Sequence, residues 1–235
     1  RHALTHIDEW MDTQYPDVYF ACWPDRLEVR PQPKGVIGII SPWNYPVNLA
    51  LLPAIGALAA GNRVLLKPSE HTPRTSALLK SFLEEALPSD VFRVVTGGVE
   101  VAEAFSGLPL DHLLFTGSPG VGKKVMRAAS ENLTPVTLEL GGKSPAIIHP
   151  SYSVRKAAGS IVQGKMFNSG QTCIAPDYVL CPADSVSDFV DASLKCAEKF
   201  HASINDNEHY TAIINERQRQ RLESYVIDAE EKGAK

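Results

Sequence analysis

The sequence predicts an α/β protein built on a doubly wound parallel sheet, and two observations support this. Between residues 35 and 140, short apolar runs rich in β-branched residues alternate with longer helical patterns. The short runs are almost continuously apolar, which is typical of strands buried on both faces. Strands that alternate with helices in this way favour a parallel sheet covered by helices on both sides.

The elements follow one another in a βαβα order. We expect strands at Gly35–Ser41, Arg63–Lys67, Phe92–Val95, His112–Thr116 and Val136–Leu140. We expect helices at Pro46–Ala60, Pro73–Leu87, Val99–Phe105 and Pro119–Glu131, and a charged helical pattern opens the chain. Thr72 and Ser118 each precede a proline, so their hydroxyls are predicted to cap the helices that begin there.

After residue 140 the pattern changes. A short strand at Ala146–Ile148 precedes predicted helices at Val154–Phe167, Val186–His201 and Glu216–Glu231. This strand would have few partners within the chain, which indicates that a second domain is only partly present.

The composition excludes two classes of partner. With 23 Lys and Arg against 27 Asp and Glu, the net charge is −4, so no basic surface for nucleic acid is expected. The longest apolar run, Leu49–Ala60, is interrupted by Pro53 and Gly56 and is shorter than the about 20 residues that span a bilayer. No membrane segment is therefore predicted.

Cysteines and histidines give no sign of a disulfide framework or a metal site. The four cysteines form no C-x-x-C pair, which favours a reducing, cytoplasmic location. Cys22, Cys181 and Cys196 lie in apolar or helical contexts and are predicted to be small buried side chains. His2 and His6 could share a helix face but have no third ligand nearby, so no metal is expected.

Polar or glycine-rich turns follow four of the predicted strands. In open α/β sheets, ligands bind beyond the carboxyl ends of the strands. These turns are Ser41–Pro46, Lys67–Glu70, Gly117–Gly122 and Glu139–Lys143. Together they predict a site for a polar ligand.

Lys67 and Glu70 end the second strand, three residues apart. As donor and acceptor they could hold two vicinal hydroxyls of a ribose, or they could be a solvated pair on a loop. At an adenosine ribose, the charge of Glu70 would favour the 2′-hydroxyl of NAD over the 2′-phosphate of NADP.

The turn Gly117–Gly122 (GSPGVG) leads into a helix, whose N-terminus is a favourable place for a phosphate. Gly117–Lys123 also matches part of a Walker A loop, but Lys124 stands where that motif needs Ser or Thr. A tight turn capped by Ser118 is the simpler alternative.

Two further residues suggest chemistry. Asn44 follows Pro-Trp in a turn, where its amide could donate to an oxyanion or only cap its own backbone. Cys173 follows a Gly-Gln-Thr turn, where we expect an exposed and reactive thiol. A thiolate needs a base or a positive environment to form, and Glu139 is the candidate base.

Several motifs resemble those of the aldehyde dehydrogenase superfamily. LELGGKSP at Leu138–Pro145 is similar to its glutamate signature, and FNSGQTC at Phe167–Cys173 is similar to its cysteine signature. SPWNYP, KPSE and FTGSPGVGK occur in the family's order and spacing. The continuation CIAPDY resembles the class 3 branch, and the long match around SPWNYP looks most like the coniferyl aldehyde dehydrogenases.

The resemblance implies NAD(P)-dependent oxidation of an aryl, coniferyl-type, or medium-chain aldehyde to the carboxylic acid. Cys173 would be the nucleophile that forms a thiohemiacetal and then a thioester. Asn44 and the backbone N–H of Cys173 would hold the oxyanion. Glu139 would activate the water that hydrolyses the thioester.

The resemblance also implies a Rossmann-like cofactor-binding domain at residues 1–140 and a partial catalytic domain at 141–235. Lys67 and Glu70 would bind the adenosine ribose of NAD, with NADP as a further possibility. The other implied cofactor-binding residues are Trp43, Gly97, Gly117, Ser118 and Gly122.

Family members are about twice this length, and no Glu-x-Phe-Gly-Pro element is present here. We therefore expect a fragment without the C-terminal half of an enzyme that is a homodimer or higher homo-oligomer. Because misplacement by about 1 Å can cost on the order of 100-fold in rate, two alternatives stay open. They are a dinucleotide-binding module without catalysis and a coenzyme A-acylating relative, although Glu139 favours hydrolysis to the free acid.

Overall fold

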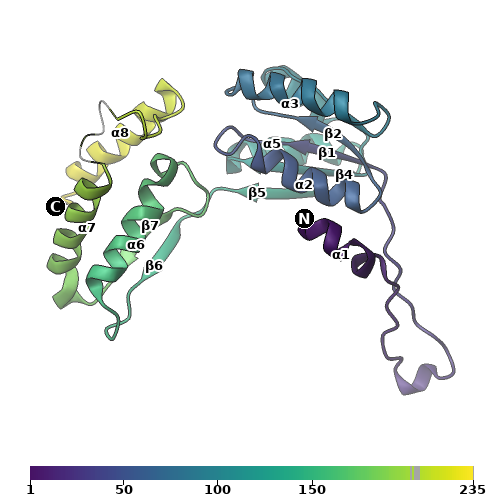
Figure 1. The fold of residues 1–235 in the computed structure, drawn as a ribbon, viewed down its shortest axis with the longest axis horizontal. Coiled ribbons are helices and arrows are strands. Elements are labelled where there is room, and N and C mark those ends of the chain that lie inside the picture. The colour runs from purple at the N-terminus through teal and green to yellow at the C-terminus, as the bar shows by residue number, and fades with distance from the viewer. Residues whose placement is uncertain (202, 204–206, 235) are drawn as a thin grey trace. The chain divides into compact units, whose positions relative to one another are not determined.

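A computed structural model describes residues 1–201, 203 and 207–234. The chain divides into two compact units, Arg1–Leu140 and Gly141–Lys235 (Figure 1). Each unit is described by itself below. None of the helices in the described ranges is long and apolar enough to cross a membrane.

The first unit contains a five-stranded sheet in the order β3-β2-β1-β4-β5. Its strands are β1 (Val36–Ile40), β2 (Arg63–Lys67), β3 (Phe92–Val94), β4 (His112–Gly117) and β5 (Val136–Leu140). All four neighbouring pairs are parallel, which confirms the predicted fold class. β1 begins one residue later than expected because Gly35 has a φ of 131°, which a strand residue does not adopt. The chain moves outward from β1 through β2 to β3 and returns to β4, so the strand order reverses between β1 and β4.

Helices pack against both faces of this sheet. They are α2 (Asn48–Ala59), α3 (Pro73–Ala86), α4 (Val99–Ser106) and α5 (Pro119–Ser130). One core cluster joins α2 and α3 to Ile39 of β1, and the other joins α4 and α5 to Ile40. Because successive side chains of a strand point to opposite faces, each of these neighbours belongs to a different layer.

The two predicted N-caps behave differently. The Ser118 hydroxyl accepts a hydrogen bond from the Val121 N–H at 3.4 Å, which confirms the cap of α5. The prediction for Thr72 is wrong, since its hydroxyl donates to the Ser69 carbonyl at 3.4 Å and makes no capping bond to α3. Thr72 has a ψ of 61°, outside the extended conformation from which a capping side chain reaches the first turn.

The chain opens with α1 (His2–Met11), which confirms the predicted helix. A short 3₁₀ helix, Phe20–Cys22, lies in a segment joined only by an antiparallel bridge between Gln14 and Val29. Cys22 is exposed here, so its prediction as a buried side chain is wrong. All three residues of this short helix are exposed, so the thiol is open to solvent.

The second unit pairs β6 (Ser144–Ile147) with β7 (Pro176–Leu180) in a two-stranded parallel sheet. Its helices are α6 (Val154–Met166), α7 (Val186–Phe200) and α8 (Glu216–Glu231), with 3₁₀ helices at Phe167–Gly170 and Ala183–Ser185. Sequence analysis missed β7, which begins with a proline, a position that strands tolerate. Cys181 follows β7 and Cys196 lies on α7, whose residues are all at least partly exposed, so both thiols are half-buried rather than buried as predicted.

Candidate functional site

The carboxyl ends of β1, β2 and β4 bring several predicted site residues to one edge of the sheet. Ile40, the last residue of β1, lies in register with Lys67 of β2 and Phe115 of β4. Beyond it, the Ser41 N–H donates to the Lys67 carbonyl at 3.1 Å. The Ser41 hydroxyl is buried, and the part of the chain that the structure describes offers it no hydrogen-bond partner. An unpaired buried hydroxyl at this edge leaves a polar group available to a ligand.

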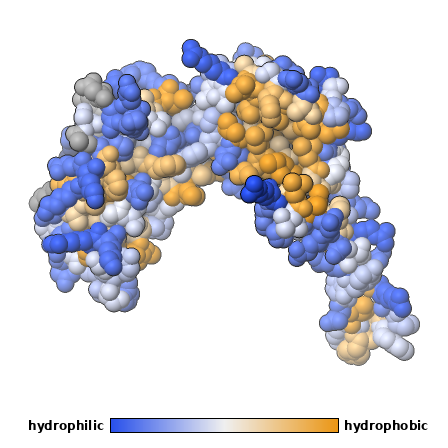
Figure 2. Space-filling model, in the orientation of Figure 1, coloured by the Kyte–Doolittle hydropathy of each residue, from blue (hydrophilic) through white to orange (hydrophobic). Residues whose placement is uncertain are grey.

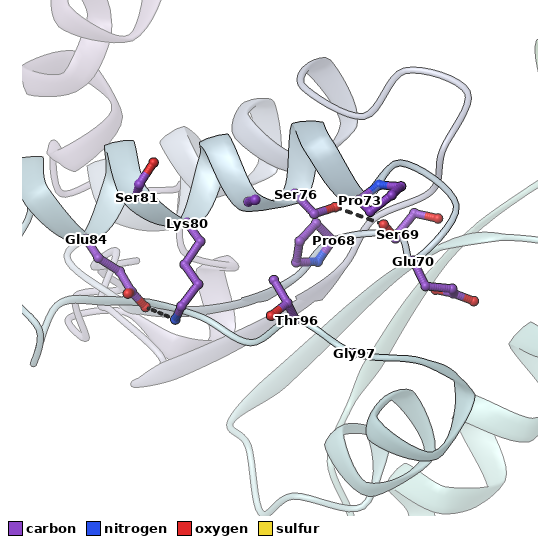
Figure 3. A pocket seen from close by; sticks show the side chains of 11 residues that line it. Pro68, Ser69, Glu70, Pro73, Ser76, Lys80, Ser81, Glu84, Thr96 and Gly97 are labelled. Carbon is purple, nitrogen blue, oxygen red and sulfur yellow. Dashed lines mark hydrogen bonds and ion pairs between the residues drawn. The ribbon is translucent and has the colours of Figure 1, made fainter.

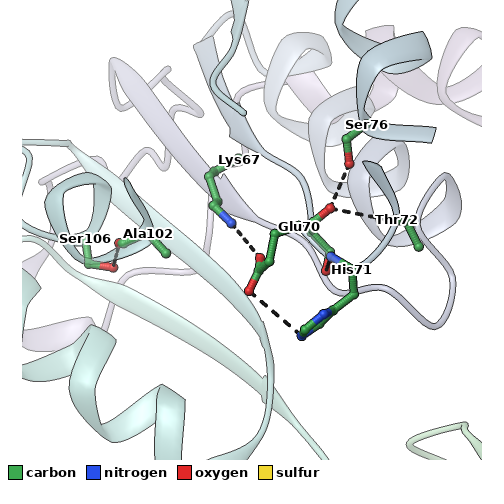
Figure 4. Close-up of polar contacts among 8 residues, drawn as sticks. Lys67, Glu70, His71, Thr72, Ser76, Ala102 and Ser106 are labelled. Carbon is green, nitrogen blue, oxygen red and sulfur yellow. Dashed lines mark hydrogen bonds and ion pairs between the residues drawn. The ribbon is translucent and has the colours of Figure 1, made fainter. Parts of the chain in front are cut away.

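Lys67 and Glu70 form a close ion pair at the end of β2 (Figure 4). The Lys67 Nζ donates to Glu70 Oε2 at 2.9 Å, and the Lys67 side chain is only 2% exposed against 36% for Glu70. Lys67 is thus not the solvated lysine of the simpler alternative. Its buried ammonium is matched by a carboxylate that still reaches the surface.

The Glu70 carboxyl is held in its ionised form. Burial by itself raises its pKa, but the hydrogen bond from Lys67, a backbone hydrogen bond and the nearby charges together outweigh that effect. The net result is a pKa below the ordinary value. At neutral pH, Glu70 therefore offers a charged acceptor for a hydroxyl group.

Glu70 also lines a cavity of about 510 Å³ (Figure 3). One wall is the face of α3 that carries Ser76, Ala77, Lys80, Ser81 and Glu84, and the opposite wall contains Thr96 and Gly97. The volume falls in the range of small-molecule sites. Sequence analysis missed the α3 wall, although the spacing of four from Ser76 through Lys80 to Glu84, with small residues beside it, could have indicated it.

Gly97 packs closely against the start of α4. A side chain built on Gly97 would overlap the Val101 side chain at the start of α4. Of the residues that the resemblance assigned to the cofactor, Glu70 and Gly97 line the cavity. The other cofactor residues do not line it. Lys67 and Gly117 are the last residues of β2 and β4, Trp43 follows β1, and Ser118 and Gly122 follow β4.

At the end of the cavity that contains Lys80 and Glu84, these two side chains of α3 bond to each other and to the backbone of the edge strand β3. The Lys80 Nζ donates to Glu84 Oε1 and to the Val94 carbonyl, both at 2.9 Å, and the Val94 N–H donates to Glu84 Oε1 at 3.1 Å. The hydrogen bond from Lys80 contributes most to lowering the pKa of Glu84. Two side chains of α3 thus satisfy backbone groups that a sheet edge leaves unpaired.

The Gly117–Gly122 turn has clear structural tasks. A side chain on Gly117 would lie 2.5 Å from the Phe115 ring, and one on Gly122 would lie 3.0 Å from Leu140. Pro119 has no N–H, and the Val121 N–H already donates to Ser118. The simpler alternative, a capped tight turn, therefore describes the geometry, and few free donors remain in the first turn of α5 for a phosphate.

The remaining predicted residues of the first unit lie on its surface or half-buried. Trp43 and Asn44 are half-buried in the turn after β1. Glu139 is exposed on the edge strand β5, in register with Thr116 of β4. An exposed carboxylate at this position can exchange protons with water.

In the second unit, Cys173 has an exposed, free thiol, as its sequence context predicts. The loop that leads to it has an unusual backbone, since Asn168, Ser169 and Gly170 have φ values of 51°, 54° and 73°. Two successive non-glycine residues with positive φ cost free energy and persist only where other contacts hold them. Such backbone conformations often mark functional loops.

Those contacts come from the segment before α8. The Gln171 side chain donates to the Ala212 carbonyl at 3.2 Å and accepts from the Ile214 N–H at 2.9 Å. The Ser169 hydroxyl donates to the Thr211 carbonyl. The Gln171 side chain also donates to the Asn168 carbonyl within the loop, at 3.1 Å. The sequence pattern assigned Gln171 no role, because Ala212 and Ile214 lie more than 40 residues further along the chain.

The second glycine of the LELGGKSP motif, Gly142, lies close to the cysteine loop. A side chain on Gly142 would lie 3.1 Å from the Cys173 carbonyl oxygen, closer than side-chain carbons normally approach. Asp177, four residues after Cys173, accepts a hydrogen bond from Lys143 at 3.2 Å. Motifs that are about 30 residues apart in the sequence are therefore packed together within the second unit.

Comparison with known proteins gives the family. The model of the aldehyde dehydrogenase family matches residues 3–235. The probable coniferyl aldehyde dehydrogenase of Pseudomonas aeruginosa is 53% identical over 99% of this chain and 49% of its own length. A dimeric, NADP-preferring aldehyde dehydrogenase of Mus musculus is 42% identical over 94% of this chain and 51% of its own length.

Comparison with solved structures gives the same family. A Mycobacterium tuberculosis aldehyde dehydrogenase complexed with NAD+ superposes with a TM-score of 0.84 at 34% identity, over 98% of this chain and 49% of that chain. The chain thus spans about half the length of the relatives it matches. Because the family model covers nearly every residue, the conclusion is that this chain belongs to the aldehyde dehydrogenase family.

Proposed function

We propose that the protein oxidises an aryl, coniferyl-type, or medium-chain aldehyde to the carboxylic acid with NAD or NADP. The observation that carries this proposal is Cys173, a free and exposed thiol on a braced loop, in a chain of the aldehyde dehydrogenase family. The coniferyl aldehyde relative supports the aryl substrate.

In the proposed reaction, the Cys173 thiolate sulfur bonds to the aldehyde carbon and the carbonyl π bond breaks, which moves the negative charge to the oxygen. The Asn44 amide and the Cys173 N–H donate hydrogen bonds to that oxygen and stabilise the thiohemiacetal. Transfer of hydride from the carbon to the acceptor that bound NAD(P) would supply, as the carbonyl re-forms, would leave a thioester on Cys173. Glu139 then takes a proton from a water molecule, whose oxygen bonds to the thioester carbon. The carbon–sulfur bond breaks, which releases the acid and the Cys173 thiolate.

The cofactor residues fit a dinucleotide in three respects. The buried Lys67 ammonium and the ionised Glu70 are a donor and an acceptor for ribose hydroxyls. Glu70 and Gly97 line a cavity of suitable size, and the Ser41 hydroxyl is a group without a hydrogen-bond partner among the described residues, at the same edge of the sheet. Bound NAD(P) would supply the hydride acceptor. The proposal adds Trp43 and the Gly117–Gly122 turn, including Ser118, as contacts to the rest of the cofactor.

The proposal extends to the organisation of the protein. Residues 1–140 act as the cofactor-binding domain and 141–235 as part of the catalytic domain, which agrees with the division into units. The complete enzyme is a homodimer or higher homo-oligomer in the cytoplasm, without a nucleic-acid partner. Four free cysteines support the reducing compartment.

The test is NADH formation from coniferyl aldehyde and from octanal by the full-length protein, with the product identified by mass spectrometry. We expect the free acid, and a coenzyme A thioester would instead identify the acylating alternative. A protein that binds NAD but converts neither aldehyde would contradict the proposal.

A second candidate is a dinucleotide-binding module without catalysis, favoured by the fact that the chain spans about half of its relatives. Calorimetric titration of the 235-residue chain with NAD, alongside the same turnover assay, separates the two. Binding without turnover by this chain, combined with turnover by the full-length protein, would show that the chain alone is the module.

A further inference from the structure

The strand that carries Glu139 is held differently on its two faces. β5 lies at the edge of the sheet and pairs with β4 alone (Figure 1). Its alternate residues Val136, Leu138 and Leu140 pack into the apolar cluster on the side of α4 and α5. Thr137 and Glu139 point to the opposite face, where the apolar cluster of the described residues includes no member of β5. Apolar packing therefore fixes only one side of this strand.

A side-chain hydrogen bond holds the other face. The His112 Nε2, at the start of β4, lies 2.9 Å from the Thr137 hydroxyl oxygen, in a partly buried position. Thr137 is in register with Leu114 of β4, and Glu139 is in register with Thr116. Because alternate residues of a strand share a face, this hydrogen bond lies on the same face as the Glu139 carboxyl, two residues away along β5.

The surroundings of His112 leave the hydrogen bond to Thr137 to orient the ring. The Nδ1 atom is buried and has no hydrogen-bond partner among the described residues. Burial lowers the pKa of His112, and the nearby charge of Lys34 lowers it further, so the imidazole is neutral at pH 7. The preceding carboxylate, Asp111, accepts from the Val36 N–H at 2.7 Å and so is engaged with β1.

We propose that His112 and Thr137 are positioning residues for Glu139, which set the place of its carboxyl for hydrolysis of the Cys173 thioester. The inference rests on the proposed function, in which Glu139 takes a proton from the attacking water. Glu139 acts only in that step, since formation of the carbon–sulfur bond and hydride transfer come before it. Loss of the hydrogen bond therefore slows hydrolysis and leaves hydride transfer unchanged.

The expected effect is moderate, because β4 and β5 keep their backbone pairing when the side-chain bond is lost. Misplacement of a catalytic group by about 1 Å costs on the order of 100-fold in rate. A strand that stays paired moves less than this, so we expect the rate constant of hydrolysis to fall about three- to tenfold.

The test measures the two chemical steps separately in the full-length protein with NAD and coniferyl aldehyde. Stopped-flow absorbance gives the rate of NADH formation in the first turnover. Mass spectrometry of the intact protein in quenched samples gives the decay of the acyl group on Cys173.

Two variants remove the hydrogen bond from either side. His112→Phe keeps a planar ring without its nitrogens, and Thr137→Val keeps the branched shape without the hydroxyl. Each should hydrolyse the thioester about three- to tenfold more slowly than the wild type, with an unchanged first-turnover rate. The double variant should be no slower than the slower single variant, since both changes remove the same bond.

Three further variants serve as controls. His112→Gln and Thr137→Ser keep a hydrogen-bonding group at each position and should hydrolyse the thioester faster than His112→Phe and Thr137→Val. Ser106→Ala is the matched control, because it removes a partly buried hydroxyl bond to the Ala102 carbonyl within α4. It should leave both chemical steps unchanged.

Hydrolysis as fast as in the wild type in both His112→Phe and Thr137→Val would overturn the inference and leave the proposed function standing. Equal slowing of both chemical steps would also overturn it, since that result would show a general structural role. A wild-type protein that forms neither NADH nor an acyl adduct would overturn the proposed function, and this inference with it.

Discussion

The two units differ in what holds their functional residues in place. In the first unit, Ile39, Leu66 and Leu113 are fully buried, in two clusters on opposite faces of the sheet. In the second unit, the described parts of α7 and α8 contain no buried residue, and Ile147 on β6 is 74% exposed. Apolar side chains of the first unit also gather at its surface over α2 (Figure 2).

This difference shows two ways to position a site. Lys67 is the last residue of a central strand, so burial of the sheet fixes the ion pair with Glu70. The loop before Cys173 is instead fixed by hydrogen bonds from Gln171 and Ser169 to the segment before α8. Apolar packing resists single changes in polar groups, whereas a few hydrogen bonds can each be removed by one substitution.

The largest expected effect is on chemistry in the second unit alone. Cys173→Ala in the full-length protein should lower aldehyde oxidation by about 10⁴-fold or more, because no other group replaces the nucleophile. NAD affinity should stay within about twofold. Steady-state rates and calorimetric titration check both values, and retained turnover would refute the role of Cys173.

The next effect concerns stability and contrasts the units directly. Leu66→Ala should reduce the free energy of unfolding by about 2–5 kcal/mol, because it opens a cavity in a closed cluster. Ile147→Ala, at a largely exposed position, should cost less than about 0.5 kcal/mol. Urea denaturation of the 235-residue chain measures both. Equal losses would mean that the second unit is as tightly packed as the first.

A smaller effect should follow from loosening the cysteine loop. Gln171→Ala removes the hydrogen bonds to Ala212 and Ile214 and should lower kcat by about 10- to 100-fold through misplacement of Cys173. Gln171→Glu keeps an acceptor for the Ile214 N–H and should lose less.

The readout is kcat together with NAD affinity, which should not change. A loss of NAD affinity equal to the loss in kcat would show that Gln171 supports the whole fold rather than the loop.

The smallest effect tests the ion pair of the first unit by pH. The folded pKa of Glu70 lies below the ordinary 4.5, so its contribution to stability is present above pH 4.5 and is lost as pH falls through the folded pKa. Below pH 4.5, the midpoint of unfolding should therefore fall slightly less in Glu70→Gln than in the wild type. The difference is small because the group is partly exposed. Glu85→Gln, a neighbouring exposed carboxyl on α3, serves as the control. A pH profile of Glu70→Gln identical to that of the wild type would show that the Lys67–Glu70 ion pair does not stabilise the fold.

Much of the first unit could be predicted from local pattern. β2 and β5 begin and end where the apolar runs predict, and Ser118 caps α5 as its place before Pro119 indicates. Thr72 has the same sequence context but does not cap, because its backbone turns the hydroxyl toward the Ser69 carbonyl. A hydroxyl residue before a proline can thus serve two local structures.

The sequence by itself determined the fold class, the order of the elements, the turns at the strand ends and the exposed Cys173, since each depends on neighbours within a few residues. Only the tertiary structure decided the burial of Lys67, the cavity wall formed by α3, the hydrogen bond from Lys80 to β3, and the hydrogen bonds by which Gln171 holds the cysteine loop. These features join residues up to about 40 positions apart. Such contacts form only when packing of the whole unit brings the segments together, and no short window of sequence records that geometry.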